Sequence, residues 1–96
     1  MIYNILAISD IHWGAIEAKR LYENLQLVLS TIHYLKDKLD MVVICGDYFD
    51  YRLQLNSKSA LLSLQWMDEL VKTCKESNVK RIRIVKGTQE HDNNQL

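Results

Sequence analysis

The chain has 96 residues, 48% hydrophobic and 25% charged, a composition typical of a globular domain with a modest core. Twelve basic and twelve acidic side chains give a formal net charge of zero, which argues against a bulk nucleic-acid binder. Its two cysteines lack metal-finger spacing, and there is no basic leader and no apolar run of about 18 residues. We therefore expect a single domain over residues 1–96, reduced cysteines, a cytoplasmic location and no membrane partner.

The first half of the chain alternates strand and helix patterns. Residues 2–8 are nearly all apolar, which predicts a first strand buried on both faces of a parallel sheet. A helical pattern starts near Glu17 and predicts a helix of about five turns. Its expected buried stripe is Leu21, Leu25, Val28, Leu29, Ile32 and Leu35. Residues 41–45 then predict a second short strand, which ends at Gly46.

The second half repeats the alternation. After a loop at 48–56, Asn56 or Ser57 is expected to cap a second helix, and Asn78 to end it in a left-handed conformation. Residues 80–85 alternate isoleucine and arginine, which predicts a third strand at a sheet edge or with one face uncovered. The whole order predicts an α/β fold, βαβαβ, with a three-stranded parallel sheet. The expected buried stripe of the second helix is Ala60, Leu64, Met67, Val71 and Cys74.

Each glycine of the chain follows one of the three predicted strands: Gly14, Gly46 and Gly87. Because the carboxyl ends of parallel strands meet at one edge of a sheet, the three loops should lie together where open α/β sheets bind ligands. We therefore expect the polar side chains of these loops to form one site for a metal and a phosphate.

Carboxylates and a histidine follow the first two strands. Asp10 and His12 are two residues apart, so an extended backbone would point both side chains the same way, toward a divalent metal such as Mn, Fe or Zn. Asp47 follows Gly46, and its two oxygens could bridge a pair of metal ions. Taken singly, each has a simpler interpretation: Asp10 caps a turn, His12 is a surface histidine, and Gly46-Asp47 is a common turn.

The remaining candidates lie in loops. Glu90, His91 and Asp92 follow the third glycine, where a histidine beside a carboxylate could act as a general acid, or the stretch is simply a polar tail. Arg52 either contacts a phosphate or belongs to a solvated loop. Trp13 follows a proposed ligand and either stacks on a base or packs against a partner surface.

Three motifs together resemble a known family. Asp10-x-His12, Gly46-Asp47-x-x-Asp50, and Gly87 with His91-Asp92 resemble the first three motifs of the calcineurin-like metallophosphoesterases. Within that family, Asp-Ile-His-Trp-Gly is most similar to the branch of DNA-repair exonucleases and their phage relatives. The resemblance implies a nuclease-like phosphoesterase that hydrolyses phosphodiester bonds, with DNA as a candidate substrate, and two divalent ions, manganese above all, with Fe, Zn or Mg as alternatives.

The resemblance also implies roles for single residues. Asp10 and His12 would bind one metal, Asp47 would bridge both, and His91 with its partner Asp92 would be catalytic. The family usually has Gly-Asn-His in its third motif, whose asparagine binds the second metal. Here the stretch reads Gly87-Thr88-Gln89-Glu90-His91, so either Glu90 or Thr88 takes that place.

The family adds histidine ligands from a second half of the domain, including a Gly-His-x-His motif that this sequence lacks. The resemblance therefore implies the N-terminal half of a metallophosphoesterase fold. The alternative is a binding or oligomerisation module that keeps the fold without catalysis and uses an uncovered face to associate with itself or with a partner. A nucleotide-binding domain is less favoured, because no GxGxxG or GxxxxGK[ST] loop follows any strand.

Overall fold

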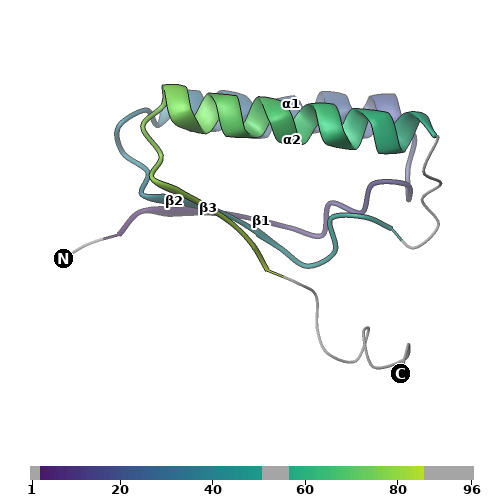
Figure 1. Cartoon of the computed structure of the whole chain (residues 1–96), viewed down its shortest axis with the longest axis horizontal. Coiled ribbons are helices and arrows are strands. Elements are labelled where there is room, and N and C mark those ends of the chain that lie inside the picture. Colours follow the sequence, from purple (N-terminus) through teal and green to yellow (C-terminus); the bar gives the residue numbers. More distant parts are fainter. Residues whose placement is uncertain (1–2, 51–56, 86–96) are drawn as a thin grey trace.

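The structure, a computed structural model, describes residues 3–50 and 57–85. Strands and helices alternate along this part of the chain, and the three strands form one sheet in the order β1-β2-β3 with both pairs parallel. Figure 1 shows the two helices as one layer above the strands. The α/β fold with a three-stranded parallel sheet is therefore confirmed. The elements are β1 (Ile5–Ser9), α1 (Ala18–Tyr34), β2 (Met41–Cys45), α2 (Lys58–Glu76) and β3 (Arg81–Val85).

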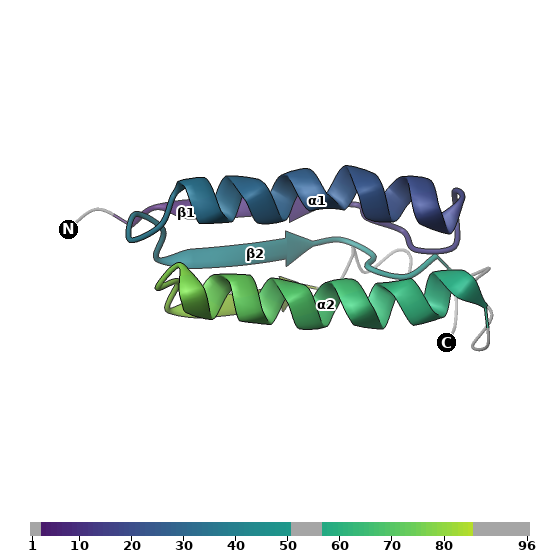
Figure 2. The same ribbon diagram turned by 90° about the horizontal axis from the view of Figure 1, so that it is seen from above.

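Both helices cover the same face of the sheet. Because each crossover between parallel strands is right-handed, a sheet ordered β1-β2-β3 places α1 and α2 on one side. Figure 2 shows the two helices side by side, with β2 running beneath the space between them. The core fills the layer between helices and sheet, and its fully buried members include Ile32, Val42, Ile44, Trp66 and Leu70.

The prediction for α1 is confirmed, whereas that for β1 is wrong in one respect. Leu21, Leu25, Leu29 and Ile32 are all buried along α1, as their spacing predicts. In β1, the residues alternate between exposed and partly buried, and Ile5 is 52% exposed. Only Leu6 and Ile8 pack against the core, because both helices lie on one face and β1 is at the edge of the sheet.

The predicted stripe of α2 is wrong at two positions. Leu64 is 67% exposed and Val71 is also exposed, while the buried side of the helix consists of Ala60, Ser63, Trp66, Leu70 and Cys74. The helix is rotated so that the indole of Trp66 enters the core and donates a hydrogen bond from Nε1 to the carbonyl oxygen of Leu25 on α1, at 3.2 Å. A large aromatic ring with its polar atom satisfied contributes more buried area than Leu64 would.

The ends of α2 agree with the prediction. The hydroxyl of Ser57 accepts a hydrogen bond from the backbone N–H of Ala60, which makes Ser57 the N-cap. Asn78 has φ of 62°, the left-handed conformation that ends a helix.

The third strand forms an edge of the sheet, as expected. β3 begins at Arg81 rather than at Lys80, and it leaves Ile84 56% exposed. Within residues 3–50 and 57–85, neither helix has the length and apolar character needed to span a bilayer.

Candidate functional site

The carboxyl ends of the three strands lie in register, and the loops after β1 and β2 stay paired beyond the sheet. Ser9, Cys45 and Val85 are neighbours across the sheet. The backbone N–H of His12 then donates to the carbonyl oxygen of Asp47 at 3.0 Å, and Gly46 N–H donates to Val85 carbonyl oxygen at 3.1 Å. The predicted convergence of the first two loops is thus built from backbone hydrogen bonds.

Asp10 and His12 lie together, although not for the predicted reason. Their φ angles are 56° and 55°, so the backbone is left-handed rather than extended. The turn nevertheless brings Asp10 Oδ1 within 3.6 Å of His12 Nε2, too long for a hydrogen bond but close enough for two ligands of one ion. The side chains of Asp10 and His12 are 69% and 36% exposed, respectively, so solvent reaches both side chains.

The backbone of Gly46 provides the space for the Asp10 carboxylate. A Cβ added at residue 46 would lie 2.5 Å from Asp10 Oδ1, and the φ of Gly46 is 81°. A residue with a side chain would therefore be strained in its backbone and would also displace the carboxylate. Glycine at this position is what allows the end of β2 to approach Asp10.

The two loops pair through their backbones at Trp13 and Phe49. Trp13 and Phe49 form an isolated parallel bridge, in which Trp13 N–H donates to Tyr48 carbonyl oxygen at 2.8 Å and Asp50 N–H donates to Trp13 carbonyl oxygen at 2.7 Å. Trp13 is fully buried in the core. The structure therefore contradicts the predicted contact of Trp13 with a base or with a partner surface. Its side chain instead packs in the core, while its backbone pairs the first loop with the second.

Tyr48 connects this loop pair to α2. Its hydroxyl donates to the carbonyl oxygen of Ser63 at 2.5 Å, and its ring meets Phe49 edge-on at 4.7 Å between centroids. Burial raises the pKa of Tyr48 to about 12, and the side chain of Trp13 offsets part of that rise. Tyr48 therefore stays neutral over the physiological range. The sequence does not predict this role, because nothing in the residues around Tyr48 distinguishes it from an exposed loop tyrosine.

Asp47 lies half-buried on the neighbouring loop. The described side chains do not form a complete set of metal ligands. Within residues 3–50 and 57–85, no three His, Cys, Asp or Glu side chains are grouped so that they could hold an ion. The predicted positions Arg52, Thr88, Glu90, His91 and Asp92 lie outside the described residues. The structure thus brings together two candidate ligands, Asp10 and His12, with Asp47 on the adjoining loop.

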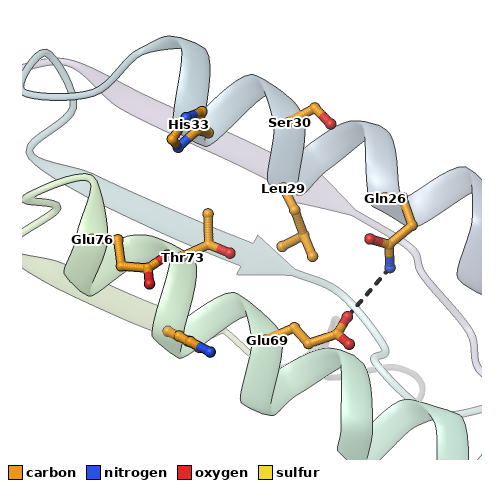
Figure 3. A pocket seen from close by; sticks show the side chains of 8 residues that line it. Gln26, Leu29, Ser30, His33, Glu69, Thr73 and Glu76 are labelled. Carbon is orange, nitrogen blue, oxygen red and sulfur yellow. Dashed lines mark hydrogen bonds between the residues drawn. The ribbon is translucent and has the colours of Figure 1, made fainter.

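The remaining histidine lies elsewhere. His33 is exposed on α1, about 22 Å along the helix axis from Ala18 at the rise of an α-helix. Figure 3 shows it in a groove between α1 and α2, opposite Thr73 and Glu76. Further along this groove Gln26 donates to Glu69. The Tyr22 hydroxyl also donates to the Glu69 carboxylate, whose two oxygens lie 2.8 and 2.7 Å from it, so the groove is a polar contact between the helices.

The profile of one family, described as calcineurin-like phosphoesterase, matches residues 3–92. The chain belongs to the calcineurin-like phosphoesterase family. No curated protein and no solved structure matches the chain. The α/β fold with a three-stranded parallel sheet agrees with that membership, and the family match supports a phosphoesterase function.

Calcineurin-like phosphoesterases bind divalent metals, and the pair described here suits one. A carboxylate oxygen beside an imidazole nitrogen is a ligand set for Mn, Fe or Zn, and both side chains are accessible to solvent in the loop after β1. The close approach of Asp10 to Gly46 fixes one of these ligands relative to the loop that carries Asp47. The described residues therefore fit part of a metal shell.

Proposed function

We propose that this chain is a metal-dependent phosphoesterase that hydrolyses phosphodiester bonds, of the nuclease type found in the DNA-repair exonuclease branch of its family. The observation that carries this proposal is the pairing of Asp10 Oδ1 and His12 Nε2 at 3.6 Å, beside the Gly46-Asp47 turn and at the carboxyl edge of the sheet. Oxygen and nitrogen ligands at such an edge suit a divalent metal rather than a nucleotide phosphate alone.

The proposed roles follow the chemistry of the side chains. Asp10 and His12 would hold one metal ion, and Asp47 and Glu90 would supply further oxygen ligands. Manganese is the proposed metal. When bound, the metals would activate water and offset the negative charge that develops on the phosphoryl oxygens. His91, positioned by Asp92, protonates the leaving oxygen, and Arg52 contacts the phosphate.

Hydrolysis measured with added Mn²⁺ tests this function. We expect the chain to cleave bis(p-nitrophenyl) phosphate and a DNA oligonucleotide only with metal, and both activities to fall at least about a hundredfold in Asp10→Asn and His12→Gln. Asp68→Asn is the matched control, because Asp68 is an exposed carboxylate on α2, away from the strand ends. Full activity in Asp10→Asn would contradict the proposed site, and cleavage of phosphomonoesters only would contradict the nuclease type.

A second function is favoured by the uncovered face of the sheet. Ile5 is 52% exposed and Val85 49% exposed, and both lie on the face away from the helices, next to Met41 and Cys45 in the register. Parallel sheets are usually covered on both faces, so this face suits association with a second copy or with a partner. A chain that sediments as a monomer and binds no hydrophobic dye would contradict this alternative.

A further inference from the structure

A cavity of about 370 Å³ lies directly beside Asp47. It is open to solvent and is bordered by the loop after β2, the outer side of α2 and the end of β3, and its lining includes Asp47, Phe49, Leu64, Met67 and Ile84. The volume is within the range of cavities that hold small molecules. This cavity differs from the polar groove of Figure 3, which lies between the two helices.

Several apolar side chains that lie outside the hydrophobic core line this cavity. Phe49 is 46% exposed, Leu64 67% and Ile84 56%, yet these three residues come from three different elements and surround one opening. Exposed apolar residues scattered singly need no explanation, but their convergence is typical of a ligand pocket. Tyr48, which also lines the cavity, has its hydroxyl bound to Ser63, so its ring adds a further apolar wall.

The cavity and the candidate metal pair share one loop. Gly46 and Asp47 line the cavity, while Gly46 also borders the Asp10 carboxylate and the Asp47 carbonyl oxygen accepts from His12 N–H. A ligand that spans both places would have a phosphate near Asp10 and His12 and a neighbouring substituent near Phe49. Because a phosphate and a carboxylate repel each other, a cation between them would favour binding of such a phosphate.

We propose that this cavity is the subsite for a flat aromatic substituent of the phosphoester, an aryl group or a nucleobase, next to the phosphate. The proposal rests on the proposed function, since it requires the phosphate to bind at the metal pair. The apolar walls exclude a charged or strongly hydrated substituent, and ring burial against Phe49, Leu64 and Ile84 supplies the affinity. The subsite therefore selects aromatic phosphoesters over alkyl ones.

The test is a titration followed by methyl NMR of the whole chain with Zn²⁺, a diamagnetic ion that Asp and His bind. The ligands are methylphosphonate, phenylphosphonate and thymidine 5′-phosphate. We expect phenylphosphonate to bind with a Kd about tenfold lower than methylphosphonate and to shift the methyl signals of Leu64, Met67 and Ile84. Thymidine 5′-phosphate distinguishes two kinds of subsite. If the subsite accepts a nucleobase, the affinity for thymidine 5′-phosphate equals or exceeds that for phenylphosphonate; if it is restricted to simple aryl groups, the affinity is lower.

A matched pair of variants keeps the test specific. Leu64→Ser and Leu61→Ser each remove a leucine of α2 that is 67% exposed, but only Leu64 lines the cavity. We expect the preference for phenylphosphonate to disappear in Leu64→Ser and to remain in Leu61→Ser. Equal affinity of the two phosphonates for the wild type, or equal loss in both variants, would overturn the proposal.

The same titration separates this inference from the proposed function. If methylphosphonate and Zn²⁺ bind but the methyl signals of Leu64 and Ile84 do not respond to phenylphosphonate, the metal site stands and the aromatic subsite is overturned. If Zn²⁺ and methylphosphonate fail to bind at all, the proposed function fails, and the subsite, which requires that phosphate, is overturned with it.

Discussion

The carboxylate oxygen Oδ1 of Asp10 lies 2.5 Å from the point where a Cβ on residue 46 would stand. Asp10 follows β1 and Gly46 follows β2, so this close approach links the ends of two neighbouring strands. It allows the Asp10 carboxylate to remain within 3.6 Å of His12 Nε2. The first proposed metal ligand is therefore positioned by the absence of a side chain on the second loop.

Gly46→Ala should displace that carboxylate. We expect it to cost about 1 to 2 kcal/mol of the free energy of unfolding, from the positive φ, and to weaken Mn²⁺ binding about tenfold or more. Chemical denaturation and titration calorimetry measure the two effects. Gly14→Ala is the comparison, because Gly14 also has a positive φ, of 106°. If both variants weaken metal binding equally, the contact between Asp10 and residue 46 does not set the ligand.

Leu70→Ala and Leu64→Ala should differ in stability although both residues are leucines on α2. Leu70 is fully buried and its truncation should cost about 2 to 5 kcal/mol, whereas Leu64 is 67% exposed and its truncation should cost less than about 1 kcal/mol. Urea denaturation of the two variants tests this. A larger loss of stability in Leu64→Ala than in Leu70→Ala would instead support the helix orientation that the hydrophobic spacing predicts.

Stability should decrease at alkaline pH through Tyr48. Burial raises the pKa of this phenol from 10.0 to about 12, so the unfolded chain loses the proton first. The contribution of the neutral phenol is fully present below pH 10 and is lost as pH rises through about 12. Tyr48→Phe should show a smaller loss of stability over this interval. Tyr34→Phe, which alters a tyrosine that is 83% exposed, should behave as the wild type.

The outcome that contradicts this assignment is an identical alkaline loss in the wild type and in Tyr48→Phe. At neutral pH, Tyr48→Phe should lower the free energy of unfolding by about 1 kcal/mol, because it removes the hydrogen bond to the Ser63 carbonyl oxygen.

Glu69 should give the opposite pH dependence. Burial alone would raise the pKa of this carboxyl, but hydrogen bonds from Tyr22, Gln26 and Gln65 outweigh it and hold the pKa below its usual value. The stability it contributes is present above the usual pKa of glutamate and is lost as pH falls through the lower folded-state pKa. Glu69→Gln should therefore cost less than about 1 kcal/mol at neutral pH and nothing in acid. Chemical denaturation from neutral to acid pH measures this stability difference, with Glu76→Gln as the control. An equal cost of Glu69→Gln in acid would rule out this linkage.

Features of the fold that local sequence spacing determines were predictable, whereas features that tertiary packing determines were not. The stripe of α1 and the order of strands and helices follow from local spacing and from right-handed crossovers, so both were predictable. The face of β1 was not, since apolar residues do not reveal which face the helices cover. In α2, Leu64 and Leu70 are equally apolar, and packing of Trp66 against α1 decided between them.

The same distinction applies to the features of the candidate site. The loops that carry Asp10, His12 and Asp47 were predictable, because parallel topology alone brings strand ends together. The left-handed turn at Asp10 and the burial of Trp13 were not, because they depend on pairing with the loop after β2, at Phe49. The cavity beside Asp47 was also missed, since its walls come from elements far apart in the sequence.

Titration calorimetry with Mn²⁺ tests the central claim, that Asp10, His12 and Asp47 bind a metal at the carboxyl edge of the sheet. We expect the wild type to bind Mn²⁺, Asp10→Asn and His12→Gln to bind about tenfold more weakly or worse, and Asp47→Ala to lose binding. Asp68→Asn should bind as the wild type does. Equal Mn²⁺ binding by the wild type and Asp47→Ala would contradict the assignment of the site.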